Sequence, residues 1–158
     1  MPLRHIISIL LQNEAGALTR VAGLFSARGY NIDSLTVAAT LDPAISRLTL
    51  VTTGDEAVID QIIKQSRKLI DVLDIVDLTA RGHLEAELVL VRVVLEPIHD
   101  ASLRALLDRW PQAQIRAIDE HSRTLQFGGT GTEVDTFLSD LAAATHVLEI
   151  ARSGPAAL

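Results

Sequence analysis

The sequence predicts an α+β chain made of two tandem ferredoxin-like domains, each with the element order β-α-β-β-α-β. Two apolar, strand-like runs lie at residues 6–11 and 88–95, and each is followed by an apolar stripe of helical period. Each stripe is followed by a pair of strand-like segments, a second helical stripe and a last strand. The chain has 158 residues, which accommodates two domains of about 75 residues each.

The first half opens with the central strand Ile6–Leu11. A helix follows that ends near Gly29, and its apolar residues have the spacing i, i+3, i+4, i+7 (Leu18, Val21, Ala22 and Phe25). Two strands at 32–40 and 47–53 flank the turn signal Asp42-Pro43.

The second helix of this half is expected to begin with a capping box formed by Thr53 and Glu56. Its apolar face is predicted to comprise Ile59, Ile62, Ile63, Leu69 and Ile70. A strand at 72–78 completes the unit, and residues 79–84 follow neither period and form the expected linker. The predicted domains are therefore 1–79 and 84–158.

The second half repeats the pattern with different residues. Strands are predicted at 88–95, 114–119, 123–127 and 146–151, and the first helix is expected to end at Pro111. The two helical stripes consist of Leu103, Leu106, Leu107 and Trp110, and of Val134, Phe137, Leu138 and Leu141. The halves share architecture more than residues, so a shared function does not follow.

Composition excludes several classes of protein. The formal net charge of −6 disfavours nucleic-acid binding, which depends on Lys and Arg. An RNA-binding sheet would also need aromatic residues on its central strands, and Tyr30 is the one aromatic residue near a strand of the first half. There is no cysteine, which excludes disulfides, thiolate metal sites and a cysteine nucleophile. No apolar run approaches the roughly 20 residues that span a bilayer, so no membrane association and a cytoplasmic location are expected.

No catalytic or metal-binding constellation is found in the sequence. The five histidines are scattered and are expected to be surface or structural residues. Asp71, Asp74 and Asp77 would point to alternate faces of a strand, which favours solvated charges over acid–base work. The cluster Gly128, Gly129 and Gly131 lacks the lysine of a phosphate-binding loop and favours a plain strand-to-helix turn.

The segment 12–39 carries the clearest signal. Gly16 stands at a helix start, where free N–H groups of Gly16, Ala17 and Leu18 suit a carboxylate. Asn31 would lie at the opposite end of the helix, so it would reach this turn only from a second copy of the chain. The residues alone favour a structural interpretation, in which Asn13 and Gly16 simply shape the turn and Asn31 caps a loop.

The strand after Asn31 is expected at the edge of the sheet. Between Asn31 and Leu41 only Asp33 is charged, and an edge so poorly defended by charge is expected to pair with another chain. Edge-to-edge pairing of two copies would create the composite pocket that a role for Asn31 requires.

Several motifs resemble one family. NEAGAL, LFSARGYNIDSLTVA, the hairpin DPAISRLTLVT and the helix start GDE are similar to the ACT domain of acetolactate synthase small subunits, over residues 4–78. EAELVLVRV and the terminal IARSG resemble the C-terminal domain of that family more loosely. Generic ACT domains often have proline just before the glycine, where this chain has Ala15.

The resemblance implies a non-catalytic regulatory subunit of a transferase complex, acetolactate synthase, in branched-chain amino acid biosynthesis. It implies a homodimer through ACT domains and a catalytic large subunit that carries thiamine diphosphate, Mg²⁺ and FAD, while this chain binds no cofactor. It also implies allosteric feedback inhibition by valine, or by isoleucine or leucine. By position, the effector-binding residues would be Asn13, Ala15, Gly16, Ala17 and Leu18, with Asn31 and Ile32 from the facing subunit.

Two alternatives stay open. One is an amino-acid-sensing ACT protein that regulates another enzyme. The other is a small enzyme on a ferredoxin-like scaffold, which the missing nucleophile and acid–base groups disfavour.

Overall fold

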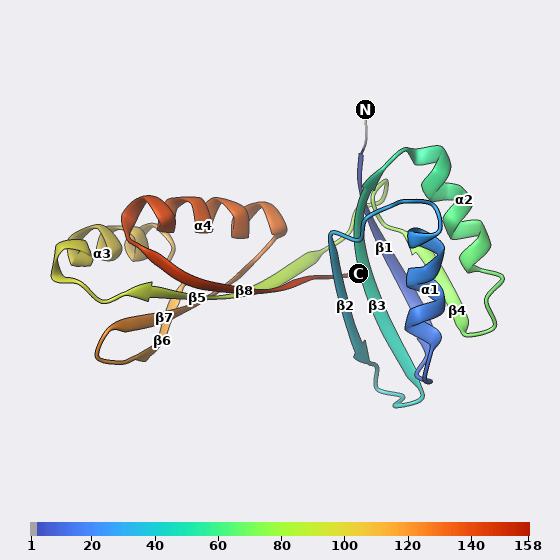
Figure 1. Cartoon of the computed structure of the whole chain (residues 1–158), viewed down its shortest axis with the longest axis horizontal. Helices are drawn as coiled ribbons and strands as arrows, with labels where there is room; N and C mark the ends of the chain where they lie inside the picture. The colour runs from blue at the N-terminus through green and yellow to red at the C-terminus, as the bar shows by residue number, and fades with distance from the viewer. Residues whose placement is uncertain (1–2) are drawn as a thin grey trace. The chain divides into compact units, whose positions relative to one another are not determined.

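The computed structural model describes residues 3–158, which divide into two compact units (Figure 1). The first unit ends at Leu84 and also includes Pro155–Leu158 at the C-terminus, and the second unit is Glu85–Gly154. The four C-terminal residues, which were expected in the second domain, thus belong to the first unit.

The first unit has the predicted order of elements. Its strands are β1 (Leu3–Gln12), β2 (Ser34–Ala39), β3 (Ile45–Gly54) and β4 (Val72–Asp77), and its helices are α1 (Ala17–Ser26) and α2 (Glu56–Ser66). The sheet order is β2-β3-β1-β4, with antiparallel pairs, which confirms the ferredoxin-like arrangement and places β2 at an edge.

Both helices cover one face of this sheet, as Figure 1 shows. Alternate residues of β1, from Ile7 to Leu11, point into a core that also takes Val21 and Phe25 from α1. The Ile59, Ile62 and Ile63 side chains of α2 complete this core, as the helical period predicted.

The opposite face of the sheet is covered in part by the C-terminal segment. Ala157 is buried with Ile6, Val51 and Leu78, and its amide donates to Thr49 Oγ1 at 3.3 Å. Leu158 and Leu84 exchange two backbone hydrogen bonds. The C-terminal residues therefore stabilise the first unit.

The second unit has the same topology. Its strands are β5 (Glu85–Val94), β6 (Gln114–Ile118), β7 (Ser122–Gly129) and β8 (Val147–Ala157), in the order β6-β7-β5-β8. The last residues of β8, from Pro155 on, lie in the first unit. Its helices are the short 3₁₀ helix η1 (Pro97–His99), α3 (Asp100–Arg109) and α4 (Gly131–Ala144). β8 continues beyond the predicted end at residue 151.

The core of the second unit is built around three aromatic side chains. Trp110 packs edge-on against Phe127 and Phe137, and those two rings stack with centroids 4.5 Å apart. The indole Nε1 of Trp110 donates to Asp140 Oδ2 at 2.9 Å, so its polar atom is satisfied.

Two predictions for the second helix of the first unit are wrong. Asp55, and not Thr53, is the N-cap residue of α2. Thr53 still belongs to β3, and its hydroxyl donates to Asp33 Oδ2 at 2.9 Å. The helix also ends at Ser66, so Leu69 and Ile70 lie beyond it, and Ile70 is 86% exposed.

Candidate functional site

The turn between β1 and α1 positions the start of α1 with unpaired amides. Gly16, the N-cap residue, has φ 87°, a left-handed conformation that favours glycine. Within residues 3–158 the amides of Gly16, Leu18 and Thr19 have no hydrogen-bond partner, whereas the Ala17 amide donates to Glu14 O at 3.3 Å. No acidic side chain stands in the first turn of the helix. The positive end of the helix dipole is therefore open to an anion.

The predicted site residues of this turn differ in exposure. Asn13, Ala15 and Gly16 are exposed, Ala17 is buried, and Leu18 is 38% exposed. Asn13 has a structural task in this chain, because its Nδ2 donates to Pro43 O at 2.9 Å and its amide donates to Ala44 O. Asn13 thereby ties the turn to the β2–β3 hairpin.

Asn31 and Ile32 lie at the other end of α1. The helix has ten residues and so is about 15 Å long. Asn31 Nδ2 donates to Asp33 Oδ1 at 3.0 Å, and the Asn31 carbonyl accepts from Thr52 Oγ1 at 2.6 Å. Ile32 packs against the core. One chain therefore does not bring Asn31 to Gly16, and their joint role in a pocket stays a prediction.

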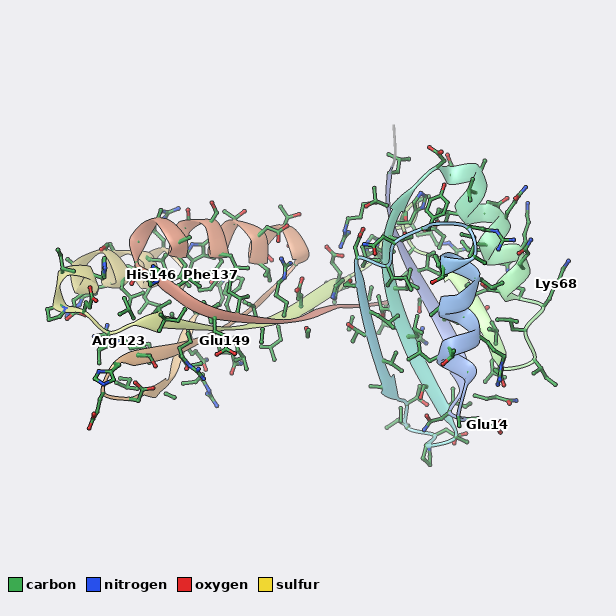
Figure 2. The ribbon with its side chains drawn as sticks, viewed as in Figure 1. Glu14, Lys68, Arg123, Phe137, His146 and Glu149 are labelled. Carbon is green, nitrogen blue, oxygen red and sulfur yellow. The ribbon has the colours of Figure 1, made fainter. Side chains whose placement is uncertain are left out.

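Arg20 and Asp71 stand beside the turn, and neither was singled out as a site residue. Arg20 Nε lies 2.5 Å from Asp71 Oδ2, and the Asp71 side chain is 4% exposed. A methyl group placed on Gly16 would lie 3.0 Å from Arg20 Nη1, so the guanidinium lies close to the glycine. Figure 2 labels Glu14, which also belongs to this turn.

The hydrogen bond between Arg20 and Asp71 shifts the pKa of both groups. It lowers the pKa of Asp71 below its ordinary value and raises the pKa of Arg20. Both groups are thus held in their charged forms next to the open amides. The one signal in the sequence was the position of Arg20, one helical turn after Gly16.

The expectation that three aspartates are solvated is wrong for Asp71, which is buried and ion-paired. Asp77 accepts a hydrogen bond at 3.0 Å from His5, and Asp74 accepts one from the Ile75 amide. His5 is a buried structural histidine, as expected. The three carboxylates do not share a site.

In the second unit, the glycine cluster forms the predicted turn from strand to helix. The N-terminus of α4 is closed by a capping box: Thr130 Oγ1 accepts from the Glu133 amide, and Glu133 Oε2 accepts from the Thr130 amide at 2.7 Å. The Glu133 carboxylate occupies the place that a phosphate would take.

Residues 3–158 show neither the features of a metal centre nor those of a membrane-spanning helix. No group of three or more His, Asp or Glu side chains there is arranged to hold a metal ion. No helix of that range is long and apolar enough to cross a membrane.

The edge strand β2 carries few charges. Its residues are half-buried or exposed, with Val37 41% exposed, and its outer side has no neighbouring strand in the described chain. An edge of this kind is suited to pairing with another strand.

The fold, the turn before α1 and the matching family models together define the class of protein. Two ferredoxin-like units stand in tandem, and residues 7–74 match the model of the "AHAS small subunit-like ACT domain", so the first unit is an ACT domain. Residues 86–158 match the model "Small subunit of acetolactate synthase".

Full-length relatives agree with this class. The chain is 45% identical over 152 residues to the acetolactate synthase small subunit of Haemophilus influenzae, covering 96% of this chain and 93% of the relative. It is 43% identical, with the same coverage, to the acetolactate synthase isozyme 3 small subunit of Escherichia coli. The chain belongs to the family of acetolactate synthase small subunits, which confirms the resemblance found in the sequence.

A solved structure extends the likeness to the whole fold. The crystal structure of the acetolactate synthase small subunit from Thermotoga maritima matches with a TM-score of 0.86 at 30% identity. The match covers 99% of this chain and 96% of that one. Both units and their topology are therefore those of the family.

Proposed function

We propose that this chain is the regulatory subunit of acetolactate synthase in branched-chain amino acid biosynthesis, without a catalytic site of its own. In this role it binds and activates the catalytic large subunit and makes the complex sensitive to feedback inhibition by valine. The observation that carries the effector role is the start of α1, where Gly16 is left-handed and three amides are unpaired.

The chemistry of this turn suits the carboxylate of an amino acid. The helix dipole contributes roughly 0.3–2 kcal/mol to an anion there, and each charge-assisted hydrogen bond about 1.5–3 kcal/mol. Arg20, whose guanidinium lies close to Gly16 and pairs with Asp71, offers further N–H donors beside the same amides. Leu18 is 38% exposed next to them and offers an apolar contact for a branched side chain.

The second half of the pocket is proposed to come from a partner copy. Pairing of two β2 edges would join the sheets of two ACT domains and bring Asn31 and Ile32 of one chain towards Gly16 of the other. Support for this comes from the low charge of β2 and from the distance between the two ends of α1 within one chain. Effector binding would then favour one dimer arrangement, which the catalytic subunit would sense.

The cofactors belong to the partner in this proposal. Thiamine diphosphate, Mg²⁺ and FAD are assigned to the large catalytic subunit, and the complex is placed in the cytoplasm. The relatives are named as small subunits, which supports a larger partner for this chain.

Two measurements test the function. Thermal unfolding is followed with valine, isoleucine and leucine, and with serine and phenylalanine as controls. A branched-chain ligand at 100 times its Kd should stabilise the chain by about 2.7 kcal/mol. The chain is then mixed with an acetolactate synthase large subunit. We expect higher activity, which valine reduces.

The outcomes of the unfolding and activity measurements distinguish the possible roles of the chain. Stabilisation by a branched-chain amino acid without activation of the large subunit would point to a sensor for another enzyme. Activation without any stabilisation would refute the effector site and leave the subunit assignment intact. Turnover by the chain alone would contradict the non-catalytic role.

A further inference from the structure

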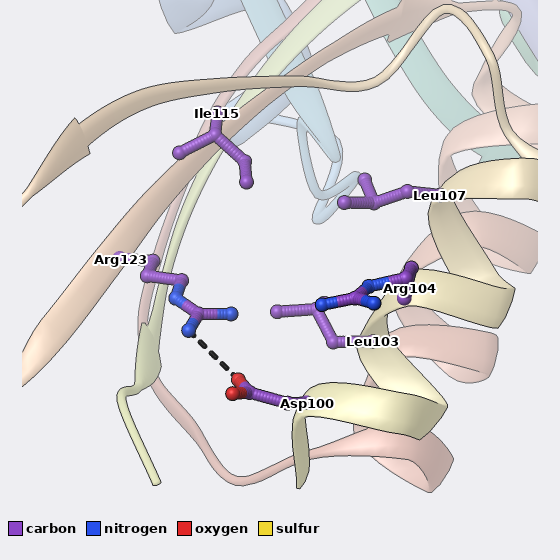
Figure 3. A pocket seen from close by; sticks show the side chains of 6 residues that line it. All are labelled: Asp100, Leu103, Arg104, Leu107, Ile115 and Arg123. Atoms are coloured by element: carbon purple, nitrogen blue, oxygen red, sulfur yellow. Dashed lines mark hydrogen bonds and ion pairs between the residues drawn. The ribbon is translucent and has the colours of Figure 1, made fainter. Parts of the chain in front are cut away.

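A pocket in the second unit lies between α3 and the strands β6 and β7. It has a volume of about 170 Å³ and is lined by Asp100, Leu103, Arg104, Leu107, Ile115 and Arg123. Figure 3 shows the residues of α3 on one side and Ile115 and Arg123 on the other. None of these residues belongs to the ACT-domain site.

The pocket combines an apolar wall with two guanidinium groups. Leu103 is buried, while Ile115 on β6 is 42% exposed, so apolar surface remains uncovered at the rim. Arg104 and Arg123 bring two positive charges against the single carboxylate of Asp100. In a chain with a net charge of −6, this excess of positive charge is local.

The two arginines differ in their partners. Arg123 Nη2 donates to Asp100 Oδ1 at 2.7 Å, and its side chain is 20% exposed, so the pair fixes the guanidinium at the wall. Arg104 is exposed and has no hydrogen-bond or ion-pair partner within residues 3–158. A fixed guanidinium and an unpaired one on the same small pocket are suited to one planar anion.

Size and charge narrow the ligand further. An apolar cavity of about 150 Å³ holds a six-atom ring such as benzene, so this pocket suits an organic ligand of about seven heavy atoms. The ammonium group of an amino acid would be repelled by the two guanidinium groups. The carboxylate of Asp100 compensates only in part, because one of its oxygens already accepts a hydrogen bond from Arg123. A carboxylate without an amino group fits better than an amino acid.

We propose that this pocket is a binding site for a short aliphatic monocarboxylate of about five carbons. The carboxylate is held by Arg104 and Arg123, and the alkyl part lies against Leu107 and Ile115. This site is independent of the proposed effector site in the first unit.

The test is a titration of the full chain with isovalerate, followed by the NMR shifts of the Leu107 and Ile115 amides. We expect saturable shifts with a Kd on the order of 1 mM, as for a ligand of this size. Arg104→Gln should weaken binding roughly tenfold or more, because one charge-assisted hydrogen bond is lost.

Arg109→Gln is the matched control. Arg109 is on the same helix but is paired with Asp140 at 2.8 Å and lies outside the pocket. It should leave the isovalerate Kd unchanged, and Gly16→Asp should leave it unchanged too, which separates this site from the effector site.

Three results would overturn the proposal. The first is no shift of these amides at 50-fold the expected Kd, or about 50 mM. The second is an equal shift with the neutral isovaleramide, which would show that the arginines are not used. The third is an equal shift with valine at the same amides.

Discussion

The two units share one strand order, yet their first helices begin in opposite ways. α1 starts at the left-handed Gly16 with no acidic residue in its first turn, and its amides stay unpaired. α3 follows the 3₁₀ helix η1 and has Asp100 in its first turn, where the carboxylate pairs with Arg123. The first unit thus has no acidic side chain at its positive helix end, whereas the second places a carboxylate in the first turn of its helix.

This difference shows why a repeated fold need not carry a repeated site. The same β-α-β-β-α-β order positions a helix N-terminus after the first strand of each unit. The residues of the turn then decide whether that N-terminus can receive an external anion. We therefore expect amino-acid binding in the first unit and a different ligand chemistry in the second.

The largest expected effect comes from Gly16→Asp. The new carboxylate would compete for the free amides and repel a bound carboxylate, and the residue would have to keep a left-handed backbone. We expect the affinity for valine to fall roughly 100-fold or more, as two charge-assisted hydrogen bonds are lost. Thermal unfolding at increasing valine concentrations measures this.

The matched control is Gly23→Ala on the same helix. A methyl group there meets nothing within 4 Å, so the variant should keep its valine response and gain up to about 1 kcal/mol of stability. An unchanged valine affinity in Gly16→Asp would contradict the site in the first unit.

The next effect concerns the C-terminal segment, which covers the first unit's sheet. Ala157→Asp puts a carboxylate next to Ile6 and Val51, and we expect the first unit to lose about 1–3 kcal/mol. Hydrogen exchange should rise in β1 and β3 and stay unchanged in β5 and β7. Ala156→Asp, at an exposed neighbour, is the control, and equal losses in both variants would show that the segment does not pack as described.

A smaller loss of stability is expected from variants at the N-termini of the second helices of the two units. Thr130→Ala removes the capping box of α4 and should cost about 1 kcal/mol of stability. Asp55→Ala should cost less, because the Asp55 side chain makes no capping hydrogen bond in α2. Hydrogen exchange of each helix measures the two losses, and a larger loss for Asp55→Ala would reverse the comparison.

The smallest effect is on the acid dependence of stability. The pKa of Asp71 is lowered from its ordinary value of 3.8 by Arg20, so the pair stabilises the fold above pH 3.8. This contribution is lost as the pH falls below 3.8 towards the lowered pKa. Asp71→Asn should therefore flatten the acid limb of the stability curve in urea unfolding.

Asp60→Asn provides the comparison for that experiment. Asp60 pairs with Lys64 at the surface, with both side chains more than half exposed, and such pairs contribute little. If both variants flatten the acid limb equally, the Arg20–Asp71 pair contributes no more to the acid dependence of stability than a surface ion pair.

Much of the fold could be predicted because hydrophobic periods repeat clearly in both halves. The ends of helices and strands were harder to predict. Leu69 and Ile70 continued an apolar pattern, yet they follow the helix because the chain turns at Ser66, whose hydroxyl donates back to Ile62 O. Thr53 matched the sequence pattern of a capping box, but its hydroxyl donates a hydrogen bond to Asp33, 20 residues earlier in the chain.

The candidate site could be predicted in part for the same reason. Local features such as Gly16 at a helix start are visible in a sequence. The pairing of Arg20 with Asp71 joins residues 51 positions apart, and only the sheet register brings them together. Asn13 shows the reverse, since its contact with Pro43 gives it a structural role beside any role in binding.

The central claim is that the effector pocket is shared between two copies of the chain, and mixed dimers test it most directly. Gly16→Asp and Asn31→Ala are prepared separately, and valine binding is measured for each by calorimetry. Each variant alone should bind valine weakly or not at all. After the two are mixed and allowed to exchange subunits, each hybrid dimer would contain one intact pocket, so we predict that tight valine binding returns. If no binding returns although hybrid dimers form, the residues do not share a pocket and the account is wrong.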